Sequence, residues 1–227
     1  MHVAIIMDGN RRWAKSRGLP VAEGYRRGVG SLRAAVRGAI AAGVDVLTVF
    51  GFSTENWQRD PSEVSVLMQL CAIFARTELA ELRRQDVSVG VVGDLAQFAP
   101  PARGAIRELV RETAHNSGLR LNLALNYSGR AEILRAVRQI AAKIETGNLR
   151  ASEVDESALR GNLYAPQLPD PDLLIRTGGD FRVSNFLLYQ LAYTELLMLP
   201  VMWPDFTEND FADAISVYAE RCRRFGS

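Results

Sequence analysis

The stretch HVAIIM, residues 2–7, is almost entirely apolar and ends abruptly at Asp8-Gly9-Asn10-Arg11-Arg12. A short apolar run bounded by turn residues is typical of a buried strand in a parallel sheet. The turn that follows places one carboxylate beside two guanidinium groups. It is either an ordinary solvated turn or half of a site for a metal and a phosphate. The residues that follow the other strands distinguish these two interpretations.

The same pattern recurs along the chain. Apolar runs predict five further strands, at residues 44–50, 87–92, 119–125, 173–175 and 196–199. Helical periodicity predicts helices at residues 24–42, 62–84, 102–116, 130–145, 186–193 and 208–223. Strands that alternate with helices indicate an α/β fold. We therefore expect a single domain over residues 1–227, with a mostly parallel six-stranded central sheet flanked by helices.

The composition excludes several classes of protein. The 227 residues are 48% apolar and 23% charged, with a net charge of +1, which is typical of a soluble globular domain and gives no general attraction to nucleic acid. The two cysteines, Cys71 and Cys222, have neither disulfide nor metal-ligand spacing, and two histidines are too few for a zinc site. Without a signal peptide or an 18-residue apolar stretch, we expect a cytoplasmic protein that does not span a membrane.

The helix at residues 62–84 has a clear start and an unusual apolar pattern. Asp60 can cap it, Pro61 suits its first position, and Glu63 can complete a capping box. About 23 residues would span roughly 35 Å. Because apolar residues lie on two of its sides, the helix either packs between layers or lines an apolar cavity, and the pattern alone favours the first.

Polar residues follow the other predicted strands too. Ligands of open parallel sheets bind beyond the carboxyl ends of the strands, where Arg176, Arg182 and Ser184 are expected to meet Asp8. Arginine forks bind phosphate oxygens, Gly178-Gly179 lets backbone N–H groups approach an anion, and Asp8 is a natural Mg²⁺ ligand. A nucleotide site is disfavoured, because no Walker A motif is present and GVGSLR, residues 28–33, lacks the third glycine of a dinucleotide fingerprint. The residue types therefore predict diphosphate binding with a metal.

Several long motifs resemble a known family. They are HVAIIMDGNRRWA, FSTENWQRDPSEV, VVGD, LNLALNYSGRAEI, DLLIRTGGDFRVSNFLLYQLAYTEL, WPDF and RRFG, which run in this order from His2 to Gly226. They resemble the cis-prenyltransferases, typified by undecaprenyl diphosphate synthase. The resemblance implies an enzyme that condenses isopentenyl diphosphate with an allylic diphosphate (farnesyl, geranyl or dimethylallyl), with Mg²⁺ as cofactor and release of diphosphate.

The resemblance also assigns residues. It implies catalytic roles for Asp8, Asn10 and Asn56, and Mg²⁺ binding by Asp8 with Glu195 near the metal. The substrate-binding residues that it implies are Gly9, Arg11, Arg12, Trp13, Tyr25, Ser53, Thr54, Glu55, Trp57, Arg59, Arg176, Arg182 and Ser184. The helix at residues 62–84 becomes the wall of an apolar tunnel. The motif at Arg224-Phe225-Gly226 implies a homodimer, and the lipid product implies an association with the membrane surface.

Three residues depart from the pattern of the family. Val21 stands where many members carry arginine, Tyr25 where they carry histidine, and Phe181 where a polar residue is frequent. Tyr25 is similar to some short-chain members, whereas the small Gly51 leaves the tunnel open, so the product length, the preferred primer, the base and the pathway stay open. The alternatives are an irregular, branching condensation, a non-elongating prenyl transfer, or a silent partner subunit; the last is disfavoured because Asp8 is retained.

Overall fold

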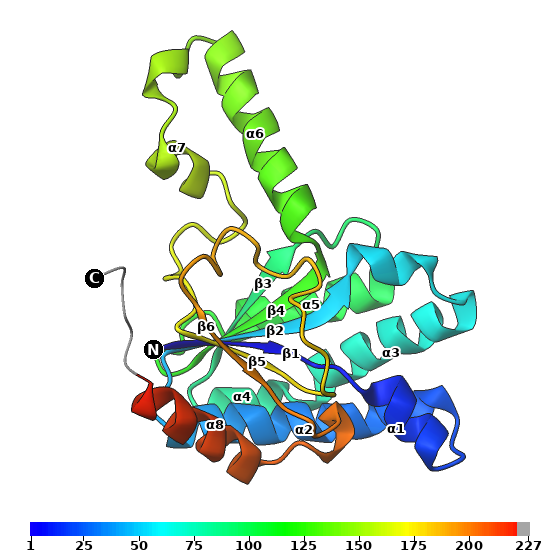
Figure 1. The fold of residues 1–227 in the computed structure, drawn as a ribbon. Coiled ribbons are helices and arrows are strands. Elements are labelled where there is room, and N and C mark those ends of the chain that lie inside the picture. Colours follow the sequence, from blue (N-terminus) through cyan, green and yellow to red (C-terminus); the bar gives the residue numbers. More distant parts are fainter. Residues whose placement is uncertain (222–227) are drawn as a thin grey trace.

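The protein is built around one sheet of six strands, all of them parallel. The computed structural model describes residues 1–221, and the strand order is β3-β4-β2-β1-β5-β6 (Figure 1). The strands are β1 (His2–Ile6), β2 (Val46–Ser53), β3 (Ser88–Gly93), β4 (Arg120–Tyr127), β5 (Leu173–Arg176) and β6 (Glu195–Met198). The predicted α/β class and the six predicted strands are confirmed, with boundaries shifted by a few residues at most.

Helices and short 3-10 segments connect the strands. The α-helices are α1 (Asn10–Ser16), α2 (Val21–Ala41), α3 (Pro61–Thr77), α4 (Leu79–Arg84), α5 (Pro100–Glu112), α6 (Gly129–Glu145), α7 (Glu156–Arg160) and α8 (Glu208–Glu220). The 3-10 segments are η1 (Thr54–Gln58), η2 (Ala151–Glu153) and η3 (Trp203–Asp205). None of the helices within residues 1–221 is both long and apolar enough to cross a membrane.

The alternation of side chains along β1 divides the core into two layers. Val3 and Ile5 point to the larger layer, which packs against α2, α3, α5 and α8. Ala4 and Ile6 point to a smaller layer that includes Phe186 and Leu187. Helices α6 and α7 project away from the sheet on this side (Figure 1). Because both faces of β1 are buried, the strand is apolar at every position rather than at every second one.

The structure corrects the helix expected at residues 186–193. This segment forms turns instead, and backbone φ angles are positive at Ser184 (47°), Asn185 (63°) and Leu187 (41°). Residues in that region of φ cannot continue a right-handed helix. Phe186 is fully buried and stacks on Phe50 of β2, with ring centroids 4.4 Å apart. The apolar residues that suggested a helix are thus buried by an irregular segment.

The helix expected at residues 62–84 is two helices. Its start is as predicted, since Asp60 accepts a hydrogen bond from Ser62 N at 2.8 Å and Pro61 is its first residue. Glu63 does not close a capping box, because its carboxylate accepts from Tyr25 instead. The chain breaks at Glu78, which ends α3 and is held by two hydrogen bonds from Arg33 of α2, at 2.6 and 2.8 Å. The 17 residues of α3 span about 26 Å.

Candidate active site at the carboxyl edge of the sheet

The backbone after β1 is fixed so that Asp8 faces the carboxyl edge of the sheet. Two hydrogen bonds with Thr177 hold the backbone of Asp8 in place. Asp8 N donates to Thr177 Oγ1 at 3.0 Å, and the Thr177 hydroxyl donates to the Asp8 carbonyl at 2.7 Å. Gly9 follows with φ at 108°, and a Cβ at this position would lie 2.9 Å from Met202 Cβ. Its N–H donates to Asp8 Oδ1 at 2.6 Å. The glycine is therefore required both by the backbone angle and by the close approach of Met202.

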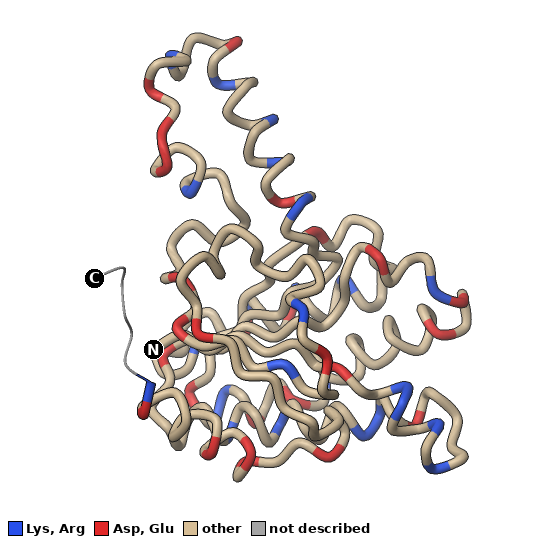
Figure 2. Tube along the Cα trace, viewed as in Figure 1, with Lys and Arg blue, Asp and Glu red and all other residues tan. Residues whose placement is uncertain are grey.

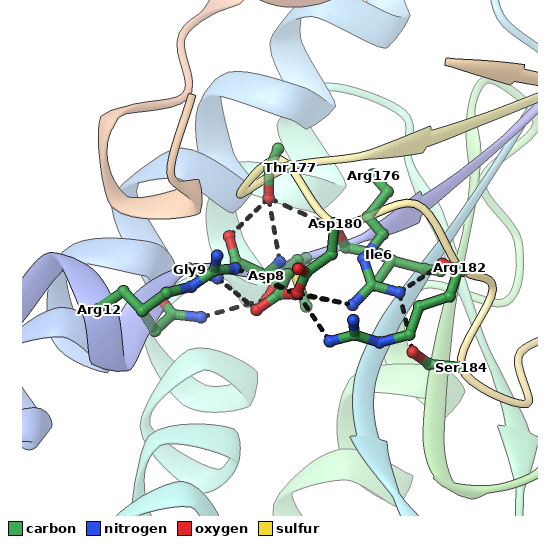
Figure 3. Close-up of polar contacts among 11 residues, drawn as sticks. Ile6, Asp8, Gly9, Arg12, Arg176, Thr177, Asp180, Arg182 and Ser184 are labelled. Atoms are coloured by element: carbon green, nitrogen blue, oxygen red, sulfur yellow. Dashed lines mark hydrogen bonds and ion pairs between the residues drawn. The ribbon is translucent and has the colours of Figure 1, made fainter. Parts of the chain in front are cut away.

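Arg176, the last residue of β5, lies beside Asp8 (Figure 3). Its Nη2 donates to Asp8 Oδ2 at 2.8 Å, and its Nη1 donates to Ser184 Oγ at 2.8 Å and to the carbonyl of Arg182. The side chain of Arg176 is only 4% exposed, and its Nε is buried without a hydrogen-bond partner among the described residues. These hydrogen bonds fix the plane of the Arg176 guanidinium, which lines the cavity.

A second carboxylate, Asp180, lies at the centre of this cluster. Its Oδ2 is 2.7 Å from Arg182 Nη2, 3.4 Å from Arg12 Nη2 and 3.5 Å from Arg176 Nη2. Arg12 also lies 3.4 Å from Asp8 Oδ2. Three guanidinium groups and two carboxylates therefore share one small region. The three arginines, Arg12, Arg176 and Arg182, are here called the arginine cluster. Asp180 was not among the predicted site residues, although it lies inside the RTGGDFRVSNF motif.

The electrostatics of the arginine cluster favour an anion. Partial burial alone would raise the pKa of Asp8, but hydrogen bonds from Arg176 and the Gly9 amide, together with the charges of Arg176 and Arg12, outweigh it and hold the pKa below the ordinary aspartate value. Asp8 is thus ionised at neutral pH. Basic and acidic residues are otherwise interspersed over the chain, while α1 beside the cluster carries mainly basic ones (Figure 2).

The structure corrects the role predicted for Gly178-Gly179. Their N–H groups do not point to an anion, because Gly178 N donates to Val201 O at 2.7 Å and Gly179 N donates to Leu199 O at 2.9 Å. Both residues have positive φ, 85° and 78°. A Cβ on Gly178 would lie 2.6 Å from Arg12 Nη2. These glycines therefore allow the turn and the approach of Arg12, and the arginines provide the anion-binding groups.

The segment after β2 forms the opposite side of the site. Ser53 caps η1 reciprocally with Asn56, whose Oδ1 accepts from Ser53 N at 3.1 Å. Glu55 accepts from Asn185 Nδ2 at 2.8 Å, which ties this segment to the loop after β5. Trp57 donates from Nε1 to Asn126 Oδ1 at 2.8 Å. These contacts fix the loop that carries Asn56 toward the cavity.

Tyr25, Arg59 and Glu63 form a hydrogen-bonded triad at the start of α3. The Tyr25 hydroxyl donates to Glu63 Oε1 at 2.6 Å, and Arg59 Nη1 donates to the Tyr25 hydroxyl at 2.5 Å and to Glu63 Oε1 at 2.7 Å. Burial and the bond to Glu63 raise the pKa of Tyr25, so its hydroxyl stays neutral at physiological pH. The triad joins α2 to the loop before α3 and places Arg59 at the cavity.

These groups surround the mouth of one cavity of about 980 Å³. Its inner part is apolar and includes Leu32, Leu67, Phe74 and Ile106. Cys71 also lines it, and burial raises the pKa of this thiol to about 12. The apolar stripe of α3 thus lines a cavity as well as packing in the core, which is the arrangement that the second interpretation of this helix predicted.

Most of the predicted site residues line this cavity. They are Asp8, Gly9, Asn10, Arg11, Arg12, Tyr25, Ser53, Glu55, Asn56, Arg59, Arg176, Arg182 and Ser184. Trp13, Thr54 and Trp57 are not among its lining residues. Trp13 donates instead to Asp205 Oδ1 at 2.7 Å and holds α1 against η3. Arg130 and Asn185 also line the cavity and were not among the predicted site residues.

Glu195 lies apart from this site within the chain. It is the first residue of β6 and pairs with Leu173, the first residue of β5, whereas Arg176 pairs with Met198 at the other end. Its carboxylate accepts from Arg221 Nη1 at 3.0 Å. Asp8 and Glu195 thus lie at opposite ends of the parallel strands within this chain, a placement that sequence order does not reveal, and the metal-binding role of Glu195 stays a prediction.

Comparison with known proteins finds relatives over essentially the whole chain. A family model described as "Putative undecaprenyl diphosphate synthase" matches residues 6–226. The chain is 50% identical to an isoprenyl transferase of Geobacillus kaustophilus over 225 residues, covering 99% of this chain and 88% of the relative. It is 46% identical to the ditrans,polycis-undecaprenyl-diphosphate synthase ((2E,6E)-farnesyl-diphosphate specific) of Shewanella oneidensis, covering 99% and 82%.

Solved structures agree. Lavandulyl diphosphate synthase from Lavandula x intermedia, in complex with dimethylallyl diphosphate, matches with a TM-score of 0.97 at 40% identity, covering 100% of this chain and 98% of the other. A probable undecaprenyl diphosphate synthase from Campylobacter jejuni matches with a TM-score of 0.81 at 30% identity, with the same coverage. The chain belongs to the cis-prenyltransferase family, as its motifs indicated. It is an isoprenyl transferase.

Proposed function

We propose that residues 1–227 form a single catalytic domain that condenses isopentenyl diphosphate with an allylic diphosphate and forms a Z double bond. One observation carries the proposal: a cluster of arginines lies at the mouth of a cavity whose inner part is apolar. An allylic diphosphate has a strongly anionic head and a hydrocarbon tail. The cluster fits the head and the apolar part of the cavity fits the tail.

The arginine cluster provides the binding groups for diphosphate. Arg176 is fixed by Asp8 and Ser184, and Arg182 is more exposed, at 62%. Guanidinium groups held in this way bind phosphate oxygens through two parallel N–H bonds. Asn10 lines the cavity beside Asp8, and its Nδ2 uses one donor on the Met7 carbonyl at 3.2 Å. The second N–H of this amide is available for a diphosphate oxygen.

The residues present fit a magnesium ion. Mg²⁺ usually takes one or two carboxylates and completes its shell with water and substrate phosphates. Asp8 is an ionised carboxylate at the cavity, and within residues 1–221 no group of three or more acidic, histidine or cysteine side chains forms an all-protein metal site. Asp8 would therefore hold the ion together with the substrate. When bound, Mg²⁺ neutralises charge on the departing diphosphate.

The reaction follows from this arrangement. The allylic C–O bond breaks and its electron pair leaves with the diphosphate, whose growing negative charge the guanidinium groups of Arg12, Arg176 and Arg182 stabilise. The terminal double bond of isopentenyl diphosphate then attacks the allylic carbon, and a proton is lost from the adduct. The cavity keeps the hydrocarbon away from water and holds the two substrates in contact.

We further propose a homodimer that releases its lipid product at the membrane surface in the cytoplasm. Support comes from β6, which is an edge strand of the sheet and exposes Leu196 (43%) near Tyr193 (81%). An exposed apolar sheet edge is a common contact surface between chains. The motif at Arg224-Phe225-Gly226, on which the expectation first rested, lies outside the described residues.

The proposal is tested by a product assay. The enzyme is incubated with radiolabelled isopentenyl diphosphate, Mg²⁺, and dimethylallyl, geranyl or farnesyl diphosphate in turn, and the products are separated by reversed-phase chromatography. We expect linear prenyl diphosphates with at least one of these primers, and none when Mg²⁺ is removed by EDTA. No linear product with any primer would contradict the proposal.

A second candidate is a branching condensation between two allylic diphosphates. The TM-score of 0.97 to a synthase bound to dimethylallyl diphosphate favours it, as do Val21 and Tyr25 at positions that are usually charged or basic. Dimethylallyl diphosphate supplied as the sole substrate distinguishes the two functions. A product from it alone supports the second candidate, and turnover that requires isopentenyl diphosphate supports the first.

A further inference from the structure

Five of the six arginines that line the cavity are paired with carboxylates of the chain. The arginine cluster is paired with the two carboxylates beside it, and Arg11 and Arg59 are paired with Glu63 at 3.8 and 2.7 Å. The sixth, Arg130, forms no ion pair with any carboxylate within residues 1–221. A diphosphate that binds to the other five must compete with a carboxylate, whereas Arg130 offers its charge and its donors without this competition.

Asn185 fixes the backbone of Arg130 at the start of α6. Its Oδ1 accepts from Arg130 N at 2.9 Å, and its carbonyl accepts from Gly129 N at 2.7 Å. Its Nδ2 donates to Ser128 Oγ and to Glu55 Oε1, both at 2.8 Å. The φ angle of Asn185 is 63°, a conformation that asparagine adopts more readily than most side chains. One residue thus ties the start of α6 to η1 and to the loop after β5, so the base of the Arg130 side chain is held at the cavity.

The first turn of α6 is an unfavourable place for a positive charge that serves the helix alone. Arg130 is the second residue of α6, and the N-terminal end of a helix is the positive end of its dipole. An anion in front of Arg130 would interact favourably with both the guanidinium and the dipole. The N–H groups of Gly129 and Arg130 are used by Asn185, and that of Ala131 donates to Ser128 Oγ at 3.3 Å. The guanidinium is therefore the group in this turn that can bind the anion.

The place of Arg130 in the fold indicates which substrate it serves. The inner part of the cavity, at Leu32, Phe74 and Ile106, belongs to the larger core layer, which packs against α2, α3 and α5. Arg130 begins α6, which projects from the other face of the sheet, on the side of the smaller layer (Figure 1). The hydrocarbon tail of an allylic primer fits the larger layer. Isopentenyl diphosphate has only one isoprene unit and does not need that space, so the side of Arg130 remains for it.

We propose that Arg130 is a further substrate-binding residue, whose guanidinium binds the diphosphate of isopentenyl diphosphate. The proposal rests on the proposed condensation and assigns Arg130 to one of its two substrates. The loop that holds Arg130 through Asn185 also carries Ser184, whose Oγ accepts from Arg176 at 2.8 Å. The start of α6 and the end of β5 then provide arginines for the same diphosphate.

The same helix offers a matched control. Arg138 is exposed on α6, does not line the cavity and forms no ion pair within residues 1–221. Arg130→Gln removes the charge and keeps a polar side chain, Arg130→Lys keeps the charge, and Arg138→Gln removes a charge at a distance from the cavity. Because neither arginine is paired with a carboxylate, we expect the melting temperatures of all three variants to equal that of wild type, which circular dichroism measures.

Isothermal titration with isopentenyl diphosphate alone, in the presence of Mg²⁺, measures binding without turnover, because this substrate has no allylic C–O bond to break. We expect Arg130→Gln to raise the Kd for isopentenyl diphosphate about tenfold, as for the loss of one charge-assisted hydrogen bond, and Arg130→Lys to raise it about threefold. Arg138→Gln should match wild type. The Kd for farnesyl diphosphate should stay within about twofold of wild type in every variant. In steady-state assays the KM for isopentenyl diphosphate should rise in parallel with its Kd, which a purely structural role of Arg130 would not produce.

The outcomes separate this inference from the proposed function. If wild type binds no isopentenyl diphosphate and forms no product with any primer, the proposed condensation fails. If wild type forms product and Arg130→Gln binds isopentenyl diphosphate as tightly as wild type, the condensation stands and the role of Arg130 is wrong. Equal or greater weakening of farnesyl diphosphate binding also overturns the assignment to isopentenyl diphosphate. A loss of the same size in Arg138→Gln overturns it too, since the effect would then be that of net charge.

Discussion

Arg176 and Asp8 lie 168 residues apart in the sequence and meet through a hydrogen bond of 2.8 Å between Nη2 and Oδ2. The bond joins the ends of two neighbouring strands, because β1 and β5 pair in parallel and Ile6 lies opposite Arg176. It neutralises a nearly buried guanidinium and keeps the Asp8 carboxylate ionised. The same two groups are those that the proposed reaction requires for diphosphate and metal.

Asp8→Asn tests the carboxylate with little change in shape. The amide cannot replace the negative charge, so we expect kcat to fall about 10²–10³-fold, as for the loss of one electrostatic group in an active site. The melting temperature should also fall slightly, because Arg176 loses its charged partner. Asp213→Asn, on an exposed position of α8, is the control and should behave like wild type. Full activity of Asp8→Asn would refute its assigned role.

Asp180→Asn tests the carboxylate that was not predicted. Asp180 contacts all three guanidinium groups of the arginine cluster, so an incoming diphosphate must compete with it. A neutral amide competes less, and we expect inorganic diphosphate to bind about tenfold more tightly, which is ~1.4 kcal/mol. Isothermal titration with inorganic diphosphate measures this. Weaker binding would mean that Asp180 instead holds the arginines in place.

The central strands could be predicted because they are largely buried. The apolar run at β1 is buried on both faces, and a local sequence is enough to show this, whereas β6 at the sheet edge is only partly buried. The segment at Phe186 could not be predicted, because its burial depends on stacking against Phe50 of a distant strand. The break at Glu78 likewise depends on Arg33, which lies 45 residues earlier.

The part of the site that lies at the ends of strands could be predicted from the sequence. Asp8, Arg176 and Ser184 come directly after or close to apolar runs, and parallel strands bring such residues to one edge. Glu195 lies away from these residues within the chain because it begins a strand rather than ending one. Asp180 was overlooked because its importance lies in contacts with three arginines, which residue type and spacing do not reveal.

Tyr25→Phe tests the triad at the start of α3. The variant removes the hydroxyl that receives a hydrogen bond from Arg59 and donates one to Glu63. A net loss of about 0.5–0.7 kcal/mol for each of the two hydrogen bonds predicts a rise of roughly 5–10-fold in KM for the allylic diphosphate, with kcat within about twofold of wild type. Tyr189→Phe, outside the cavity, is the control. A fall in kcat at unchanged KM would argue against a positioning role for Tyr25.

The pair of Arg33 and Glu78 should make stability depend on pH. Burial would raise the pKa of Glu78, but hydrogen bonds from Arg33 and Thr77 outweigh it and lower the pKa. A carboxylate whose pKa is lowered by folding contributes its full stabilisation above its unfolded pKa of about 4.3. That stabilisation is lost as the pH falls through the lower pKa of the folded state. We expect Arg33→Met to lower the free energy of unfolding by roughly 1–2 kcal/mol at pH 7, since Arg33 is partly exposed.

The difference between Arg33→Met and wild type should begin to shrink below about pH 4, the unfolded pKa of Glu78, and should approach zero only when the pH has fallen below the lowered pKa of folded Glu78. Urea unfolding at several pH values measures it. Arg84→Met is the matched control, because Arg84 forms an exposed pair with Glu81 within one helix and should change stability little. A difference that stays constant with pH would show that Arg33 acts through packing alone.

Gly51→Leu tests the middle of the cavity. Gly51 lies in β2 and lines the cavity, and a Cβ there would come within 3.0 Å of Leu125 Cδ2, so a larger side chain must extend into the open space. We expect the longest product to shorten by about one isoprene unit relative to wild type, because a leucine occupies ~100 Å³ at four side-chain carbons. Gly104→Leu is the control, since no atom lies within 4 Å of a Cβ at that exposed position. Chromatography of the dephosphorylated products measures the shift, and a product profile equal to wild type in both variants would mean that the hydrocarbon does not pass Gly51.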